Sequence, residues 1–273
     1  MTDKTLRNLQ LAEIEIFKVF QIICENNQLN YFIIGGTLIG AVRHGGFIPW
    51  DDDIDVAMPR EDYEKFIRIF KEQNVQPIDI AYYKDNPHLY FYPVRLVNTQ
   101  VQIIDPRTNQ PAPVWMDILP IDGLPNQTMK RKFFKLKMDS YRLALGLHYI
   151  DQLRDTKRDW KQRLAITFGK ATKIGKLFNP TKVKNRLDAT LKSHTVEQCD
   201  VIGTCMGAYY FKEFVPKDYF GSGTTIAFEG MQVRAPEQID AYLTHMYGDY
   251  MQLPPEHEQL AQHINVKTEI GEQ

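Results

Sequence analysis

Apolar residues recur at helical spacing over the first part of the chain. The recurring positions are Leu6, Leu9, Ile14, Ile16 and Phe17. This period predicts a helix over about residues 4–27. A short apolar run at 31–34 predicts a buried strand that ends at a pair of glycines, and TLIGAVRH after it predicts a short helix with a small-residue face.

The following segments alternate between strand and helix patterns. IDVAM predicts a strand, and PREDYEKFIRIFKEQ predicts an amphipathic helix that opens at Pro59. Residues 77–121 predict further strands in IDIAYY, LYFYPVRLV, VQIID and VWMDILPID. Helical patterns dominate about residues 127–200, and APEQIDAYLTHMYGDY predicts a last helix that ends at Gly248. This order predicts an α+β fold, with a mixed β-sheet core flanked by helices and a largely helical C-terminal portion.

Composition places the chain among globular proteins and suggests three parts. The 273 residues are 43% hydrophobic and 25% charged, which is enough apolar material for a large core. We expect a core domain at 1–125, a basic helical subdomain at 126–200, and a C-terminal segment at 201–273 that packs on the core.

The lack of a recognisable targeting signal and the cysteine usage favour a cytoplasmic location. The first residues lack a cationic leader followed by an apolar block, and no uncharged apolar stretch approaches the roughly 20 residues of a membrane span. Cys24, Cys199 and Cys205 include no C-x-x-C pair, and the spacing of the last two to His194 suits zinc poorly. We therefore expect a reducing, cytoplasmic location.

Charge is unevenly distributed along a chain whose net charge is only −1. Residues 126–195 hold 18 Lys/Arg and 5 Asp/Glu, and KRKFFKLK at 130–137 is the densest part. One interpretation is a solvated basic subdomain, and the other is a surface that faces an anionic polymer or makes a peripheral contact with anionic lipid at the inner face of the plasma membrane. Nucleic acid is not expected, because no recognised binding module accompanies the charge.

Four aspartates crowd into the segment IPWDDDIDVAMPR. Side chains alternate along a strand, so a strand through DIDVA places Asp53 and Asp55 on one face and apolar residues on the other. Asp51 is expected on the aspartate face and Asp52 on the opposite one. Carboxylates fixed in this way are ligands for Mg²⁺ or Mn²⁺.

A second strand, VWMDILP, carries a lone carboxylate at Asp117 among apolar residues. A buried carboxylate is costly without a partner, and a shared metal ion supplies one. Asp53, Asp55 and Asp117 from two neighbouring strands are therefore predicted to hold two divalent ions, an arrangement used for in-line phosphoryl displacement. Ahead of them, Gly35, Gly36 and Thr37 form a strand-to-helix turn that suits a phosphate, although the same turn is common without one.

Other interpretations of the aspartates fit less well. An EF-hand loop from Asp51 would need glycine and glutamate where Val56 and Asp62 stand. The D-D-x-x-D pattern of prenyl-diphosphate enzymes belongs on helices, whereas IDVAM predicts a strand. A D-x-D glycosyltransferase stays open, but only about 50 residues precede the motif. A purely structural acidic loop also stays open.

The chain resembles the LicD phosphocholine transferase family in GGTLIGAVRHGGFIPWDDDIDVAMPREDYEKF, and again in YPVRLVN, WMDILPIDG and APEQIDAYLTHMYGDYMQLPPEH. That family is related to fukutin-related protein and belongs to the broader nucleotidyltransferase fold, so the resemblance implies a nucleotidyltransferase-like core. It covers roughly residues 30–255. It implies metal-dependent transfer of phosphocholine from CDP-choline to a sugar hydroxyl of a cell-surface glycan, a teichoic-acid-type precursor or a lipid-linked oligosaccharide, with release of CMP. Transfer of ribitol or glycerol phosphate, and nucleotidyl transfer, stay open as alternatives.

Charge suggests roles for the remaining candidates in such a reaction. Asp117 either completes the second metal position or takes the proton of the acceptor hydroxyl. Arg43 and Arg95 are candidates to neutralise the leaving CMP, and His44 either binds phosphate or caps its helix. Asp51 and Asp52 are expected to orient the metal ligands. A quaternary ammonium is bound by aromatic faces, for which the candidates are Tyr82, Tyr83, Tyr90, Phe91, Tyr92 and Trp115.

Overall fold

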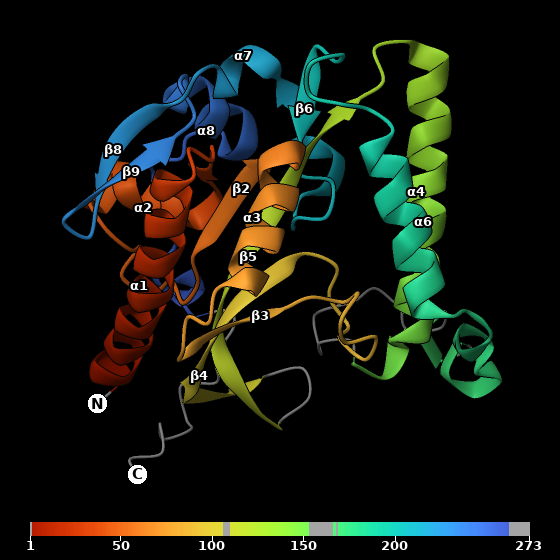
Figure 1. The fold of residues 1–273 in the computed structure, drawn as a ribbon, viewed down its shortest axis with the longest axis horizontal. Helices are drawn as coiled ribbons and strands as arrows, with labels where there is room; N and C mark the ends of the chain where they lie inside the picture. The colour runs from red at the N-terminus through yellow and green to blue at the C-terminus, as the bar shows by residue number, and fades with distance from the viewer. Residues whose placement is uncertain (1, 106–109, 153–165, 168, 262–273) are drawn as a thin grey trace.

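A seven-stranded mixed sheet flanked by helices forms the centre of the molecule (Figure 1). A computed structural model of the chain describes residues 2–105, 110–152, 166–167 and 169–261. The architecture confirms the predicted α+β class.

The first helix is as long as its apolar period predicts. Helix α1 (Thr2–Asn26) buries Leu9, Phe17 and Phe20 in the core. After it come strand β1 (Phe32–Ile33) and helix α2 (Gly35–His44). The glycine pair was predicted to precede the helix, but it forms the first turn of α2. Gly35 has φ +60°, a left-handed conformation that favours glycine.

The sheet combines one parallel pair with antiparallel pairs. Its strand order is β1-β2-β5-β4-β3, and β2 and β5 are parallel to each other. The elements of this region are β2 (Asp55–Pro59), α3 (Arg60–Glu72), β3 (Ile78–Ala81), β4 (Val94–Asp105) and β5 (Gln110–Leu124).

Two of the predicted strands are one strand in the structure. VRLV and VQIID both belong to β4, whose register against β5 shifts between Asn98 and Gln102. This bulge interrupts the apolar alternation and makes a single strand look like two. Residues 89–93, predicted as the beginning of this strand, precede it, because β4 pairing begins at Val94, just after Pro93.

The basic part of the chain is helical where it is described. Helices α4 (Thr128–His148) and α6 (Pro180–Lys192) lie side by side at one edge of the molecule (Figure 1). Two short 3-10 helices, η1 (Ile150–Gln152) and η2 (Ile174–Leu177), lie between them in the sequence. The prediction of helices over 127–200 is confirmed for these elements, and residues 153–165 and 168 lie outside the described part.

The C-terminal segment returns to the sheet. Strand β6 (Val201–Gly203) pairs with the end of β5, and a two-stranded sheet contacts β1 and α2. The further elements are η3 (Tyr210–Glu213), β7 (Val215–Pro216), α7 (Lys217–Phe220), β8 (Thr224–Phe228), β9 (Met231–Ala235), α8 (Ile239–Tyr247) and η4 (Glu256–Glu258). Helix α8 ends at Gly248 as predicted.

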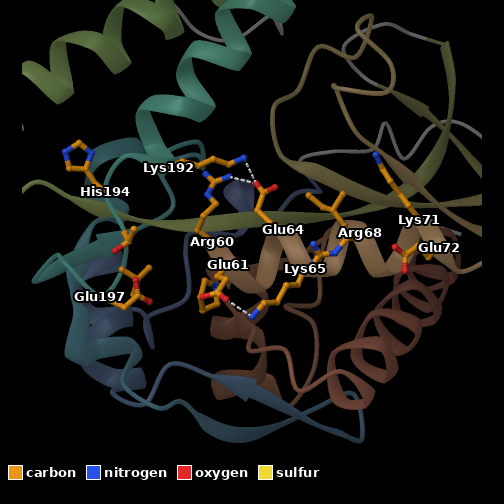
Figure 2. Close-up of a pocket in the computed structure, with 14 residues that line it drawn as sticks. Arg60, Glu61, Glu64, Lys65, Arg68, Lys71, Glu72, Lys192, His194 and Glu197 are labelled. Carbon is orange, nitrogen blue, oxygen red and sulfur yellow. Dashed lines mark ion pairs between the residues drawn. The ribbon is translucent and has the colours of Figure 1, made fainter.

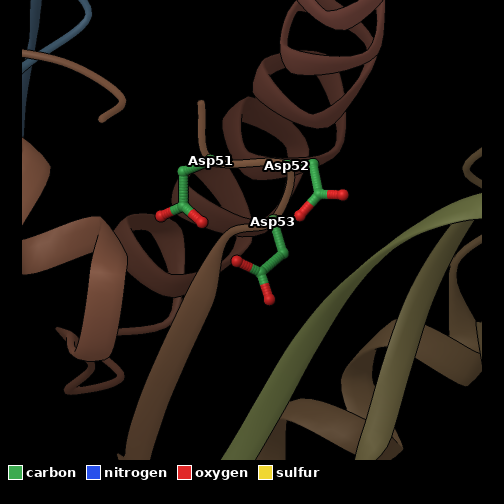
Figure 3. Close-up of side chains that lie close together, drawn as sticks. All are labelled: Asp51, Asp52 and Asp53. Carbon is green, nitrogen blue, oxygen red and sulfur yellow. The ribbon is translucent and has the colours of Figure 1, made fainter. Parts of the chain in front are cut away.

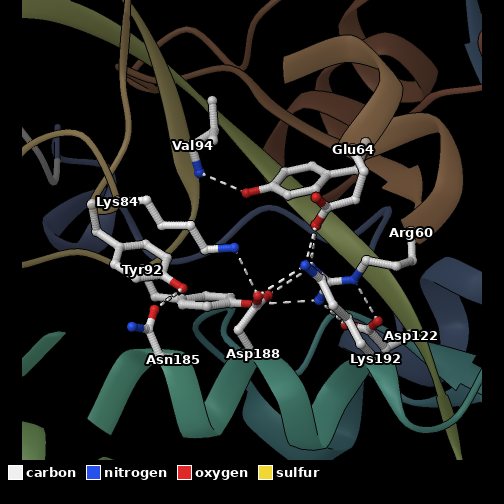
Figure 4. A network of polar contacts seen from close by, with 11 residues as sticks. Arg60, Glu64, Lys84, Tyr92, Val94, Asp122, Asn185, Asp188 and Lys192 are labelled. Carbon is white, nitrogen blue, oxygen red and sulfur yellow. Dashed lines mark hydrogen bonds and ion pairs between the residues drawn. The ribbon is translucent and has the colours of Figure 1, made fainter. Parts of the chain in front are cut away.

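A buried polar network fastens α3, β5 and α6 together (Figure 4). Arg60 Nε donates to Asp122 Oδ1 over 2.7 Å, and Arg60 Nη1 lies 3.1 Å from Asp188 Oδ1. The hydroxyl of Tyr92 also donates to Asp188, over 2.7 Å. Burial works against the Asp188 charge, but Arg60, Tyr92 and Lys192 outweigh it and hold the pKa of Asp188 below its usual value. The network fixes Tyr92, which belongs to the wall of the cavity described below.

No helix in the described part of the chain is both long enough and apolar enough to span a membrane.

Candidate active site

Three neighbouring strands bring two carboxylates and a guanidinium into line. Asp55 of β2 pairs in register with Asp117 of β5, and Asp117 pairs in register with Arg95 of β4. Residues opposite each other on adjacent strands project to the same side of the sheet at a separation of about 4.8 Å. The alignment of Asp55 and Asp117 is therefore built into the sheet.

The aspartates before β2 occupy a loop and not the predicted strand. Pairing between β2 and β5 begins at Asp55, and Asp51 N–H donates to Ile48 O in a turn over 2.8 Å. Alternation therefore does not set the direction of Asp53. Asp51, Asp52 and Asp53 each offer a carboxylate oxygen within 4.8 Å of the others (Figure 3).

Asp52 belongs to this carboxylate group although it was expected on the opposite face. It is only 2% exposed, whereas Asp51 and Asp53 line the cavity. Within the described residues, no other group of three His, Cys, Asp or Glu meets that spacing. Asp53, Asp55 and Asp117 thus line one cavity but do not form such a group of three, and Asp117 is bonded to Arg95.

The glycine pair leaves room for two of the carboxylates. A Cβ on Gly36 would lie 2.4 Å from Asp51 Oδ2, and a Cβ on Gly35 would lie 3.2 Å from Asp55 Oδ2. Tyr247 Oη would be 3.9 Å from that Gly35 Cβ. The absence of side chains at these two positions therefore permits the aspartates to approach the first turn of α2.

Thr37, Arg43 and His44, all on α2, have different surroundings. Thr37 is buried, and its Oγ1 accepts the Asp55 N–H over 2.9 Å, so it supports the beginning of β2. Arg43 lines the cavity, and burial lowers the pKa of its guanidinium. His44 is exposed, with its ring edge-on to Trp50 at 6.4 Å between centroids, and burial followed by the Arg43 charge lowers its pKa.

Arg95 is committed to Asp117 and to two aromatic rings. Its Nε donates to Asp117 Oδ1 over 2.7 Å and its Nη2 to Oδ2 over 3.2 Å. The guanidinium carbon lies 4.1 Å from the centre of the Phe91 ring and 4.5 Å from that of Trp115. Burial opposes the charge, but Asp117 and Tyr90 outweigh it and raise the pKa of Arg95. This arginine therefore fixes the orientation of Asp117.

A cavity of about 990 Å³ opens over these groups. Of the aromatic residues predicted to bind a head group, Tyr90, Phe91, Tyr92 and Trp115 line it. Tyr82 and Tyr83 are buried and take part in other contacts.

Sequence reasoning missed the aromatic residues that the C-terminal segment adds to the cavity. Tyr209, Tyr247 and Tyr250 all line it. Tyr209 is 48% exposed, and its ring stands edge-on to Tyr247 at 5.4 Å between centroids. The peptide oxygen of Tyr250 accepts from Arg43 Nη1 over 2.9 Å, which ties this segment to α2. The helical period of 239–247 indicated a helix but not which site it approaches.

A buried glutamate of α1 was also missed. Glu13 is 2% exposed, and burial, followed by the charges of Asp53, Asp52, Asp51 and Asp55, raises its pKa well above the usual value. Its Oε2 has no hydrogen-bond partner among the described residues. The signal was present in the sequence, because Glu13 interrupts the apolar face formed by Leu6, Leu9 and Phe17.

A second cavity, of about 930 Å³, lies between α3 and residues 192–197 (Figure 2). Its charged side chains are largely paired with one another. Lys192 Nζ lies 2.7 Å from Glu64 Oε1, and Lys65 Nζ lies 2.8 Å from Glu61 Oε1. It contains none of the predicted site residues, so the first cavity is the candidate active site.

The donor set of the first cavity suits a hard divalent cation. The carboxylates of Asp51, Asp53, Asp55 and Asp117 line one space, and oxygen ligands of this type are those that Mg²⁺ and Mn²⁺ prefer. Arg43 and the aromatic walls border the same space. The arrangement can hold a ligand that carries phosphate at one end and an apolar or cationic group at the other.

Comparisons with known proteins show the family of the chain. The LicD/FKTN/FKRP nucleotidyltransferase domain matches residues 28–142. The lipopolysaccharide cholinephosphotransferase LicD of Haemophilus influenzae is 34% identical over 269 residues, which are 97% of this chain and 98% of that protein. Ribitol 5-phosphate transferase FKRP of Homo sapiens is 45% identical over 40 residues, 15% of this chain and 8% of that protein. The chain belongs to the LicD family.

Proposed function

We propose that this phosphotransferase transfers phosphocholine from CDP-choline to a sugar hydroxyl and releases CMP. The observation that carries the proposal is the similarity to a cholinephosphotransferase along nearly the whole chain. The cavity supports it, because its carboxylates can hold divalent cations that would bind the diphosphate at the centre of a CDP-alcohol, and its aromatic walls suit the head group at one end.

The metal of this reaction is proposed to be Mg²⁺ or Mn²⁺, as two ions held by Asp53, Asp55 and Asp117. The ions would neutralise charge on the donor diphosphate when bound. Asp51 and Asp52 add oxygens beside Asp53, and Arg95 holds Asp117 in a fixed direction. Outer residues of this kind orient the groups that would hold the metal.

Arg43 is proposed to contact the leaving CMP. Its Nη1 is bound to the peptide oxygen of Tyr250, while its buried Nε has no hydrogen-bond partner among the described residues. A guanidinium fixed in this way stabilises charge that develops on a phosphate during transfer. Arg95, the other predicted candidate, acts in this scheme through Asp117.

The aromatic walls favour a choline head group. A quaternary ammonium cannot donate a hydrogen bond, and each aromatic face that it meets contributes about 0.5–2 kcal/mol. Tyr90 and Tyr209 bring such rings to the cavity. Local similarity to a ribitol 5-phosphate transferase makes ribitol phosphate, and by extension glycerol phosphate, the alternative donor group.

The acceptor is proposed to be a cell-surface glycan or its lipid-linked oligosaccharide precursor. For a lipid-linked acceptor, residues 130–137 are proposed to contact the anionic membrane.

Turnover with defined donors tests the proposal. The purified protein is incubated with Mg²⁺, lipopolysaccharide or lipid-linked oligosaccharide as acceptor, and CDP-choline, CDP-ribitol or CDP-glycerol as donor. Release of CMP with choline on the acceptor is expected, and both Asp53→Asn and Asp117→Asn should abolish it. CMP attached to the acceptor would establish nucleotidyl transfer instead. Faster turnover of CDP-ribitol would reassign the donor, and full activity in a chelator would refute the metal requirement.

A further inference from the structure

Helix α4 exposes a second apolar face that the fold does not use. Its inner face buries Phe134, Met138 and Leu145. Four other apolar positions are exposed, at 63% for Met129, 61% for Phe133, 65% for Leu136 and 64% for Leu143. At about 100° per residue these four fall within about 80° of the helix circumference. We call them the apolar stripe.

Lysines border the apolar stripe on both sides. Lys132 and Lys137 lie immediately beside it, and Lys130 and Lys135 lie one step further around the helix. All four are exposed. The single carboxylate of α4, Asp139, accepts a hydrogen bond from the Tyr210 hydroxyl over 2.8 Å. The exposed side of α4 is therefore apolar along its middle and cationic along its margins.

The apolar stripe with lysines on both sides favours an anionic bilayer as the partner of α4. Four large apolar side chains, each more than 60% exposed on one side of one helix, form a patch that soluble surfaces seldom leave uncovered. A second copy of this chain is disfavoured, because two lysine-bordered faces would repel each other, and lysine is depleted in protein interfaces. An anionic bilayer suits both the apolar stripe and the lysines, since acyl chains accept the apolar side chains while the lysines extend to the lipid phosphates.

We propose that α4 lies in the plane of an anionic membrane and inserts the apolar stripe at the level of the lipid head groups. The lysines alone would hold the protein at the membrane surface, whereas the apolar stripe allows α4 to insert among the lipid head groups. The other side of α4 contributes Arg142, Leu145 and Gly146 to the cavity wall. A membrane-bound α4 would thus hold the candidate active site about one helix diameter, roughly 10 Å, from the bilayer.

This distance suits a lipid-linked acceptor, and that part of the inference rests on the proposed function. The membrane contact itself does not depend on which reaction the protein performs.

Vesicle sedimentation of the full-length protein tests the contact. We expect sedimentation with vesicles of phosphatidylcholine and phosphatidylglycerol, and little with phosphatidylcholine alone. The double variant Phe133→Ser/Leu136→Ser should bind at least about tenfold more weakly. Lys132→Glu should lower binding by about fivefold or more, since each lysine near an anionic surface contributes about that factor.

Matched controls come from α1. Ile22 is an exposed apolar residue of that helix and Lys18 an exposed lysine, so Ile22→Ser and Lys18→Glu repeat the chemistry elsewhere and should bind as the wild type does. A separate variant, Phe133→Trp, should shift its fluorescence to shorter wavelength when the anionic vesicles are added. All the substituted side chains are exposed, so thermal unfolding should be unchanged.

Several results would overturn the inference. Absence of vesicle binding by the wild type would refute it, and wild-type binding by Phe133→Ser/Leu136→Ser would leave no role for insertion. If these variants instead converted a dimer to a monomer without vesicles, the partner would be a second copy. CMP release from CDP-choline with a lipid-free glycan acceptor should be the same in wild type and stripe variants. Its failure in both, with vesicle binding intact, would count against the proposed function alone.

Discussion

Replacing Gly36 with alanine should separate catalysis from stability at this site. The new Cβ would stand 2.4 Å from Asp51 Oδ2, where ordinary contact begins at 3.4 Å. The carboxylate must therefore retreat by about 1 Å, the difference between these distances. Gly36 has no positive φ, so the alanine itself fits the backbone of α2.

The expected loss follows from this displacement. Misplacement of a catalytic arrangement by about 1 Å costs about 100-fold in rate. We therefore expect kcat/KM for CMP release from CDP-choline to fall by roughly that factor. Alanine is favoured over glycine in a helix by up to about 1 kcal/mol, so the melting temperature should stay constant or rise by at most about 2–4 °C.

A double-mutant cycle with Asp51→Ala tests the steric reasoning. If the alanine acts by pushing the Asp51 carboxylate, the Gly36→Ala substitution should cost little in the Asp51→Ala background. An equal loss of kcat/KM in both backgrounds would show that Gly36→Ala acts by another route. A large fall in melting temperature would likewise contradict the argument, because it would mean that α2 does not tolerate the methyl group.

Two further predictions concern the buried cations Arg95 and Lys184. In Arg95→Lys, the lysine cannot reproduce the two N–H bonds to Asp117, so the free energy of unfolding in urea should fall by about 1–3 kcal/mol. The same substitution at the exposed Arg68 should change it by less than about 0.5 kcal/mol, and equal effects would refute the prediction. Burial lowers the pKa of Lys184 from 10.5 to about 8, so the folded state loses this proton before the unfolded state does. Wild type should gain stability relative to Lys184→Met as the pH rises from about 8 to 10.5, and a thermal-shift difference that stays constant over this range would contradict it.

Local pattern was sufficient for the carboxylates inside strands. Asp117 stands alone in the run VWMDILP, and its buried neighbours force it to the one face where a polar group is tolerated. Asp55 begins a similar apolar run in β2. Alternation alone therefore predicts that both aspartates turn away from the apolar core, although their shared register depends on how β2 and β5 pair and cannot be read from either segment.

Alternation failed where the chain leaves regular structure. The pattern assigns Asp53 to a strand face, yet β2 begins only at Asp55, so Asp53 lies in a loop. The bulge in β4 between Asn98 and Gln102 made one strand look like two for the same reason. Pattern reports direction only while the backbone keeps its period, and loops and bulges interrupt that period.

The loop that carries the aspartates depends on residues distant in the sequence. Glu229, between β8 and β9, accepts the Phe47 N–H over 3.1 Å and pairs with Arg7 of α1 over 2.7 Å. A Cβ on Gly46 would lie 2.4 Å from Glu229 Oε1, so the glycine permits this contact. Gln10 of α1 donates to the peptide oxygen of Asp51 over 2.9 Å.

The segment before β2 is thus held from two sides, by the first helix and by the C-terminal segment. Arg43 adds a third attachment through the peptide oxygen of Tyr250. Like charges packed as closely as Asp51, Asp52 and Asp53 repel one another, and a backbone fixed from outside helps to hold them within 4.8 Å. Because that support comes from residues 7–10 and 229–250, the carboxylate geometry belongs to the whole fold and not to the aspartate motif alone.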